Sequence, residues 1–256
     1  LGRELLFALQ MLHERHDVLG GMFAVVIGKA IFGGLGKNIF NPAHIGRAIL
    51  LASFPQQMTT WVIPATKAAA VTAATAGADA TTAATPLAVM RMTEKVWQAG
   101  GAAASQLPPL SDLFMGNVGG SLGETCVPAL VLGGLYLIWK KLIDWRIPVF
   151  YLATVAVLTG IYGAVMGYPS TFPLYHLFAG GLMIGAFFMA TDWVTSPITK
   201  KGKIIYAIGL GVLTSLIRLR GSYTEGVCYS ILMMNMVTPM IDRFVRNVSF
   251  GGGQKK

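Results

Sequence analysis

Long apolar runs separated by short charged segments constrain this sequence more than any other feature. Only 12% of its 256 residues are charged, about half of the roughly 25% usual in soluble domains. The sequence therefore predicts an all-α polytopic membrane protein, with residues 1–256 forming one integral membrane domain. The runs expected to enter the bilayer are Val18–Phe32, Val118–Trp139, Ile147–Met166, His176–Ala190, Ile204–Ile217 and Val227–Ile241. Because the chain opens on an apolar segment that resembles the end of a helix, we expect further N-terminal spans to precede Leu1 in the whole protein.

The segment Gly33–Ala43 interrupts the apolar pattern with a cluster of glycines followed by Asn-x-x-Asn-Pro. Non-helical backbone at membrane depth is tolerated only where protein or a cavity covers it, and such breaks mark ligand sites in transport-type folds. The amides of Asn38 and Asn41 suit hydrogen bonding to a polar ring edge such as that of an isoalloxazine. A compatible alternative is a capped helix start, with Asn41 as N-cap and Pro42 at the first helical position.

A short pattern recurs about one hundred residues apart. Gly120-Ser121…Glu124-x-Cys126 reappears as Gly221-Ser222…Glu225-x-x-Cys228, and both copies precede an apolar run. Duplicated halves with helix breaks at corresponding places are typical of inverted-repeat membrane folds. We therefore expect an inverted-repeat helix bundle that contains broken or half helices.

Four carboxylates lie at the ends of apolar runs and are candidates for an ion path: Glu124, Asp192, Glu225 and Asp242. Acidic side chains within membrane segments are costly to bury and often functional. The alternative for Glu124 and Asp192 is a structural role, in which each carboxylate accepts hydrogen bonds from its own loop. The two cysteines form no Cys-x-x-Cys pair, so a metal or iron–sulfur site made by this chain alone is not expected.

The basic residues predict an orientation. If each later run crosses the bilayer once, ten Lys and Arg fall on the side of Lys140 and Lys200, and five fall on the opposite side. Lys and Arg accumulate in cytoplasmic loops, so the richer side is expected to be cytoplasmic, although Arg218 and Arg220 oppose this assignment. In a membrane protein the net charge of +9 is a topology signal, and a nucleic-acid partner is not expected.

The longest permissive loop spans residues 62–115, and its centre reads Asp79-Ala80-Thr81-Thr82-Ala83-Ala84-Thr85-Pro86-Leu87. Pro86 disfavours the helical conformation for Thr85, so we expect an extended residue with its hydroxyl directed outward. A short amphipathic helix is expected over Leu87–Gly100. On composition alone, an Ala/Thr-rich linker is the alternative.

The order Asp-Ala-x-Thr-Ala-Ala-Thr-Pro-Leu resembles the flavinylation motif of a superfamily. Its members include the D subunit of the Rnf complex (ferredoxin:NAD⁺ oxidoreductase) and the B subunit of the sodium-pumping NADH:quinone oxidoreductase, Nqr. Similar blocks flank the motif around Gly46-Arg47, Gly120–Thr125 and Gly185–Asp192, so the resemblance extends from Phe23 to Arg243.

This resemblance implies a flavin-carrying subunit of an ion-translocating electron-transport complex. It implies FMN bound to Thr85 through a phosphoester, with Asp79 and Thr82 in the attachment motif, and a non-covalent riboflavin near Asn38 and Asn41. It also implies a bacterial inner-membrane location, the Thr85 loop on the periplasmic side, the other Rnf subunits (A, B, C, E and G) as partners, and a flavin transferase for maturation. The Thr82–Pro86 and Ser53–Thr59 blocks favour Rnf over Nqr. A non-redox channel or transporter of similar fold is the alternative of another class.

Overall fold

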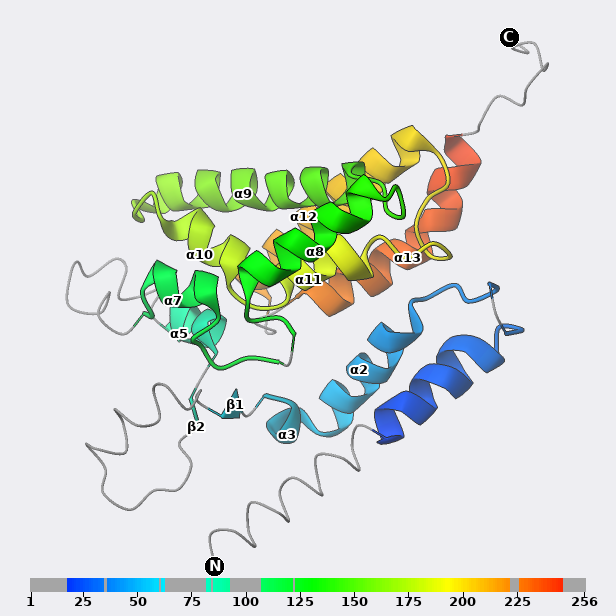
Figure 1. Ribbon diagram of the computed structural model, residues 1–256, viewed down its shortest axis with the longest axis horizontal. Helices are drawn as coiled ribbons and strands as arrows, with labels where there is room; N and C mark the ends of the chain where they lie inside the picture. The colour runs from blue at the N-terminus through cyan, green and yellow to red at the C-terminus, as the bar shows by residue number, and fades with distance from the viewer. Residues whose placement is uncertain are drawn as a thin grey trace, which may run out of the picture.

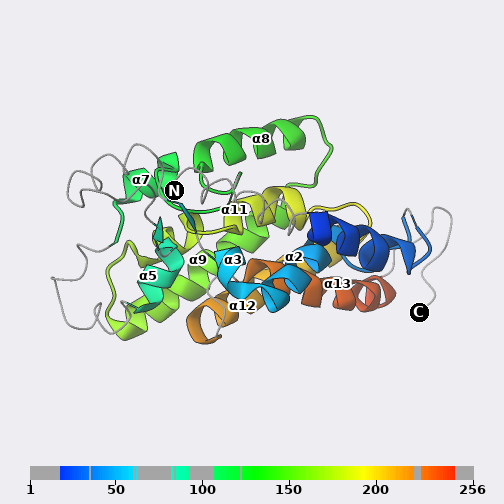
Figure 2. The same ribbon diagram turned by 90° about the horizontal axis from the view of Figure 1, so that it is seen from below.

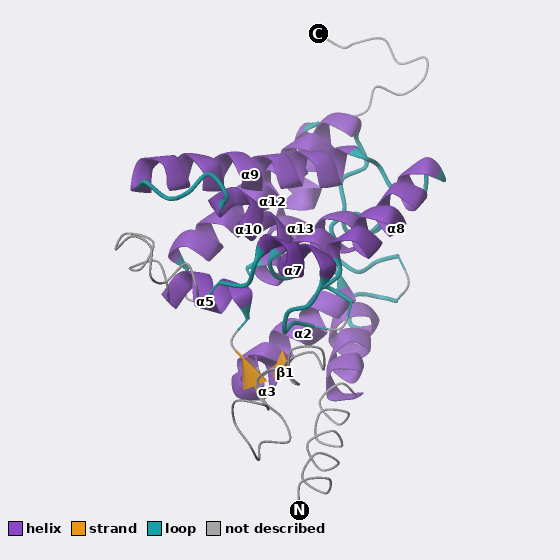
Figure 3. Ribbon diagram, turned by 60° about the vertical axis from the view of Figure 1, so that its left-hand side comes forward, coloured by secondary structure: helices purple, strands orange, loops and turns teal. Residues whose placement is uncertain are grey.

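The computed structural model describes residues 18–34, 36–59, 61–62, 82–83, 85–92, 107–121, 123–221 and 226–245. These residues are helical or in loops, apart from one antiparallel pair of two-residue strands, β1 (Trp61–Val62) and β2 (Thr82–Ala83). Figure 3 shows the predominance of helix. Within these ranges two helices, α9 (Arg146–Met166) and α12 (Lys200–Arg220), are long and apolar enough to cross a membrane, and a bent pair could form a third span. The prediction of an all-α membrane protein is thus confirmed.

The centre of the molecule is the packing of α9 against α12, with α13 (Val227–Phe244) on the other side of α12 (Figure 1). Tyr151, Leu210 and Ile231 are fully buried between these helices. Buried hydroxyls also join them, since the Tyr151 hydroxyl lies 2.6 Å from Thr214 Oγ1. Without a hydrophobic driving force in lipid, close packing and interhelical hydrogen bonds of this kind hold membrane helices together.

A bent helix lies beside α9 and departs from the sequence expectation. The sequence predicted one apolar run from His176 to Ala190. That prediction is wrong, because α10 (Phe172–Phe178) begins earlier and is separated from α11 (Leu182–Ile184) and the π-helical turn η3 (Gly185–Met189) by a break. The two halves are bent by 65°. Gly180, at φ +66°, makes the break possible because a left-handed conformation suits glycine.

The N-terminal part carries the other break. The helix Val18–Ala30 ends in a π-helical turn, η1 (Val26–Ala30), and Gly33, Gly34 and Gly36 all have positive φ. The helix α2 (Pro42–Ser53) starts as predicted, with Asn41 Oδ1 accepting the Ala43 N–H at 3.1 Å and Pro42 at the first position. It packs against α13 and leads to the short α3 (Pro55–Thr59). Broken helices are therefore confirmed, whereas the repeat stays a prediction because residues 222–225 lie outside the described part.

The described parts of the 62–115 loop lie on the helices. The helix α5 (Pro86–Met92) covers the first part of the short helix expected over Leu87–Gly100, and residues 93–100 lie outside the described residues. A second short helix, α7 (Leu110–Met115), was not predicted from the sequence. Leu87 and Met90 of α5 are buried in one cluster with Leu113 of α7 and Phe172 of α10. Figures 1 and 2 show both short helices at the end of the bundle where α9 joins α10. From α7 the chain continues to α8 (Val127–Trp139), a 13-residue apolar helix.

Candidate functional site

Thr85 is the N-cap residue of α5. Its Oγ1 accepts a hydrogen bond from the Ala88 N–H at 3.2 Å, its carbonyl accepts the Val89 N–H at 3.0 Å, and Pro86 follows at the first helical position. Threonine before proline is a favourable helix start, since the side-chain oxygen satisfies an N–H that the first turn leaves free. The hydroxyl is therefore directed toward the helix and half-buried, whereas the sequence suggested an outward one.

Three distant segments meet at Thr85. A narrow cleft is lined by Thr85, Pro86 and Leu87, by the loop that precedes α8, and by the break between α10 and α11. From the loop come Gly119, Gly120 and Glu124, and from the break come Phe178, Ala179 and Gly180. A Cβ built on Gly180 would lie 2.6 Å from Leu87 Cδ1, so the absence of a side chain there lets α5 approach the break. The structure thus brings Thr85 and Glu124, predicted separately, to one place.

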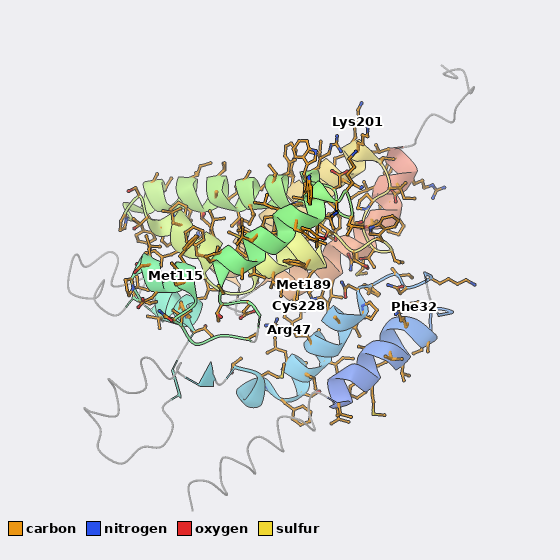
Figure 4. All side chains as sticks on the ribbon, in the orientation of Figure 1. Phe32, Arg47, Met115, Met189, Lys201 and Cys228 are labelled. Carbon is orange, nitrogen blue, oxygen red and sulfur yellow. The ribbon has the colours of Figure 1, made fainter. Side chains whose placement is uncertain are left out.

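Glu124 is buried in this cleft with one oxygen unsatisfied. Its Oε1 accepts the Ser121 N–H at 3.1 Å, as the structural alternative predicted. Its Oε2 has no hydrogen-bond partner among the described residues and lies 3.9 Å from Nη1 of Arg47. Arg47 reaches the site from α2, as Figure 4 shows. A carboxylate that is only 4% exposed and short of one donor is suited to hold a proton, a cation or a hydroxyl donor.

Arg218 stabilises the break between α10 and α11. Its guanidinium is buried at the end of α12 and donates to the His176 and Ala179 carbonyls at the C-terminus of α10. The last carbonyls of a helix carry partial negative charge and lack intrahelical partners, so a cation there is favourable. In the sequence, Arg218 and Arg220 were counted as loop charges that opposed the orientation. Arg218 is buried, whereas Arg220 is exposed at the end of α12.

A second cavity, of about 160 Å³, lies at the other break. Asn38, Asn41 and Pro42 line it from the break, Lys29 from the π-helical turn η1, and Asp192 from the loop after the π-helical turn η3. Single π-helical turns inside α-helices occur frequently at functional sites. The structure therefore brings together the predicted Asn38, Asn41 and Asp192, and adds Lys29 as a charge on the same cavity.

The backbone of the first break is fixed by α13. Asn235 is buried there, and with its amide oriented so that both ends are satisfied, its oxygen accepts the Asn41 N–H at 3.0 Å. Its nitrogen then donates to the Tyr206 hydroxyl at 2.9 Å and the Ile231 carbonyl at 3.2 Å. This cross-connection explains how a glycine-rich segment keeps one conformation beside a cavity.

The other predicted carboxylates accept hydrogen bonds of different range. Asp192 Oδ2 accepts from Thr195 Oγ1 in its own loop at 2.9 Å, whereas Asp242 Oδ1 in α13 accepts the N–H of the distant Ile198 at 3.1 Å. Thr82 belongs to β2, where its backbone pairs with Val62. Asp79 and Glu225 lie outside the described residues.

Sequence reasoning assigned no role to Arg47 or Arg218. Arg47 stands inside an apolar helix and was noted only as part of a resembling block. An isolated arginine among apolar residues is itself a signal of a buried partner, and it could have identified Arg47, whereas Arg218 has Arg220 two residues away.

Comparison with known proteins agrees with the architecture. Residues 14–251 match the NQR2, RnfD, RnfE family. The chain is 52% identical over 235 residues to the D subunit of the proton-translocating ferredoxin:NAD(+) oxidoreductase complex of Clostridium ljungdahlii, covering 91% of this chain and 67% of that protein.

Two further relatives are also named as D subunits of ion-translocating complexes. Identity is 46% over 237 residues to the D subunit of the Na(+)-translocating ferredoxin:NAD(+) oxidoreductase complex of Acetobacterium woodii, covering 91% of this chain and 66% of the relative. It is 40% over 243 residues to the D subunit of the ion-translocating oxidoreductase complex of Stutzerimonas stutzeri, covering 91% of this chain and 69% of the relative. The chain thus spans about two thirds of the length of these relatives. A match over almost the whole chain, at these identities, shows that the chain belongs to the NQR2, RnfD, RnfE family.

Proposed function

We propose that this chain is the flavin-carrying membrane subunit of an Rnf-type ion-translocating ferredoxin:NAD⁺ oxidoreductase, with FMN esterified to Thr85. The relatives are named as the D subunits of such complexes. The observation that carries the proposal is the position of Thr85, whose half-buried hydroxyl begins a packed helix beside an unsatisfied carboxylate. A linker of low complexity would have no reason to be fixed in this way.

The cleft fits an attachment point and not a complete flavin. Its volume of about 10 Å³ has room for roughly one water molecule. A phosphoester would need only the hydroxyl oxygen of Thr85, and a cleft of this size would not hold the ring. Bound FMN would supply one- and two-electron transfer. Thr85 holds it in every redox state, α5 fixes the position of Thr85, and Glu124 Oε2 offers an acceptor to a nearby hydroxyl.

The proposal includes a riboflavin near Asn38 and Asn41, but the cavity there is smaller than a complete flavin needs. The cavity there is about 160 Å³, whereas drug-sized ligands occupy pockets of roughly 300–1,000 Å³. The described residues could accordingly receive one edge of the ring, through the two amides.

Among the acids, Glu124 is the best candidate for coupling electron transfer to ion movement. It is buried, it lines the Thr85 cleft, and the positive charge of Arg47 lies beside it. Asp192, Glu225 and Asp242 remain candidates along the same path. Replacing each of the four acids and measuring redox-driven Na⁺ or H⁺ uptake in vesicles tests this assignment, and unchanged uptake in all four variants contradicts it.

The proposal includes the membrane location, the orientation and the partner subunits of the chain. The chain lies in the bacterial cytoplasmic membrane with its Thr85 loop on the periplasmic side, and it assembles with the other Rnf subunits (A, B, C, E and G) after a flavin transferase has acted. The alternative, the B subunit of Nqr, differs in its electron acceptor. The relatives' names favour Rnf.

The mass of the tryptic peptide that contains Thr85 tests the core of the proposal. Protein made together with its flavin transferase should carry FMN less one water on this peptide and give a fluorescent band on a denaturing gel. The Thr85→Ala variant should not give this fluorescent band. The Thr85→Ser variant keeps a hydroxyl and the helix cap, and it serves as the matched control for folding. A wild-type peptide of unmodified mass would favour the non-redox transporter.

A further inference from the structure

A further cavity lies at the opposite end of the bundle from Thr85 and has no role in the proposed electron transfer. It measures about 490 Å³ and is bounded by the loop between α8 and α9, the loop that follows η3, and the first turn of α12. Its charged and aromatic lining consists of Lys141, Asp144, Trp145, Arg146, Trp193 and Lys203. Three cations and one carboxylate leave an excess of positive charge around the space.

Arg146 and Lys203 are held in position by Asp144. Asp144 accepts from Arg146 Nη1 at 3.1 and 3.0 Å, from the Arg146 N–H at 3.1 Å, and from Lys203 Nζ at 3.2 Å. Burial opposes ionisation, but these donors together keep the pKa of the Asp144 carboxyl below its ordinary value, so it stays charged. One carboxylate therefore orients two cations. Nε and Nη2 of Arg146 have no hydrogen-bond partner within the described residues, and the guanidinium carbon lies 5.2 Å from the centre of the Trp145 ring. These groups are available to an anion.

Lys141 stands in a conformation that favours glycine. Its φ is +58°, and within the described residues no other non-glycine residue has a positive φ. It occupies the position after the C-cap of α8 in a Schellman arrangement, where Lys141 N–H bonds to the Ile138 carbonyl and Leu142 N–H to the Leu137 carbonyl. Glycine is the usual residue there. A strained lysine at the edge of a basic cavity points to a requirement for its charge.

The cavity wall has the character of a membrane interface. Trp193 Nε1 donates to the Leu142 carbonyl at 3.0 Å and so ties the two loops together. Trp139, Trp145 and Trp193 are exposed, and Lys140 Nζ lies 4.7 Å from the Trp139 ring centre. Tryptophan gathers at the level of lipid headgroups because its ring is apolar and its N–H is polar. Exposed Leu142 and Ile198 continue the apolar surface from the cavity mouth.

We propose that this cavity binds the phosphate of an anionic phospholipid, with Lys141, Arg146 and Lys203 contacting the headgroup. The wider surroundings agree, since residues 140–146, 190–203 and 240–245 contain seven Lys or Arg and three Asp. A basic pocket between membrane helices on the cytoplasmic side suits such a headgroup. A free phosphate would use the same cations, but it would gain nothing from the adjoining apolar surface. The lipid is therefore the favoured source.

Native mass spectrometry of the full-length protein, released from detergent micelles, tests the proposal. Phosphatidylglycerol is titrated against phosphatidylcholine of the same chain length, and inorganic phosphate is added in a separate arm. The variants are Lys141→Gly, Arg146→Gln and Lys203→Gln. The matched control is Lys200→Gln with Lys201→Gln, which removes two charges from the same end of α12 without touching the cavity lining.

Wild type should retain phosphatidylglycerol in preference to phosphatidylcholine, and combining the three substitutions should lower that occupancy by about tenfold or more, given the contribution of each cation to headgroup binding. The control pair should change it by less than about twofold. Lys141→Gly is informative because it relieves the strained backbone: the helix end becomes no less stable while lipid occupancy falls. Equal loss in the control, no preference for the anionic lipid, or displacement by inorganic phosphate alone would each overturn the proposal.

Discussion

Oε2 of Glu124 has no hydrogen-bond partner among the described residues, so a substitution of Glu124 can distinguish a structural role of this residue from a role in coupling ion movement. Glu124→Gln retains an oxygen for the Ser121 N–H and nearly the same shape, but it removes the charge beside Arg47. We expect covalent flavin at Thr85 to be unchanged and redox-driven ion uptake to fall by about tenfold, as expected when a buried charge near the path is neutralised. Flavin fluorescence on gels and ion uptake in vesicles measure the two effects. Normal uptake in Glu124→Gln would leave Glu124 a purely structural acceptor.

Gly180 gives a test with a matched control within the chain. Gly180→Ala and Gly167→Ala both place a side chain at positive φ, +66° and +74°, and each should cost about 1 kcal/mol in backbone strain. Only at Gly180 does the new Cβ meet Leu87, because nothing lies within 4 Å at Gly167. We expect similar losses of thermal stability from strain, and a fall in flavinylation of Thr85 for Gly180→Ala alone. Equal flavin content in both variants would show that α5 does not need this close approach.

At the scale of elements, the half-helix α10 depends on Arg218 of α12. Arg218→Leu leaves the carbonyls of His176 and Ala179 without this donor in a buried place. An unsatisfied buried polar group costs roughly 1–3 kcal/mol. We expect a lower unfolding temperature in detergent, and a smaller loss for Arg218→Lys, which keeps the charge but cannot bridge two carbonyls in the same way. If Arg218→Leu and Arg218→Lys lower the unfolding temperature equally, a positive charge alone does not replace the two hydrogen bonds that the Arg218 guanidinium donates.

Asp144 joins the start of α9 to the start of α12 and predicts a pH dependence. Burial alone would raise its pKa, but the Arg146 N–H and Lys203 together lower the pKa from the ordinary 3.8. A carboxyl with a lowered pKa adds stability above its unfolded-state pKa, and this stability is lost as the pH falls through the folded value. Thermal unfolding between about pH 5 and pH 2 should therefore show a steeper acid loss in wild type than in Asp144→Asn. If the unfolding temperatures of wild type and Asp144→Asn fall in parallel, solvent screens the Asp144 ion pairs so strongly that they do not contribute to stability.

The sequence predicted elements best where the signals are local. Asn41-Pro42 specified the start of α2, and the glycine cluster after residue 32 specified the first break, because caps and left-handed glycines act within a few residues. The break at Gly180 was missed. It lies in an apolar run whose interruption depends on Leu87 and Arg218, residues about 90 and 40 positions away along the chain. The role of Thr85 as a flavin attachment site stays a prediction from the motif. The cleft that Thr85 shares with the Glu124 loop could not be predicted from spacing, because it joins segments that are distant along the chain.

At the scale of the whole molecule, the two ends differ in charge and in proposed role. Met115, near the Thr85 site, and Lys201, near the basic cavity, lie at opposite ends of the bundle in Figure 4. The Lys203–Asp144 contact and the Ile198–Asp242 bond gather the loops that were counted as one side, and burial removes Arg218 from the other. The orientation, with the basic cavity on the cytoplasmic side, stays a prediction of the positive-inside rule.

This orientation predicts opposite labelling of two single cysteines. In a background with Cys126→Ser and Cys228→Ala, Met115→Cys should react with a membrane-impermeant maleimide in right-side-out vesicles, because this exposed side chain shares the Thr85 end. Lys201→Cys should react only in inverted vesicles. Detergent-solubilised protein, in which both positions are accessible, provides the control for intrinsic reactivity. Labelling of Met115→Cys from the cytoplasmic side would reverse the topology and would place the proposed flavin at Thr85 on the cytoplasmic side.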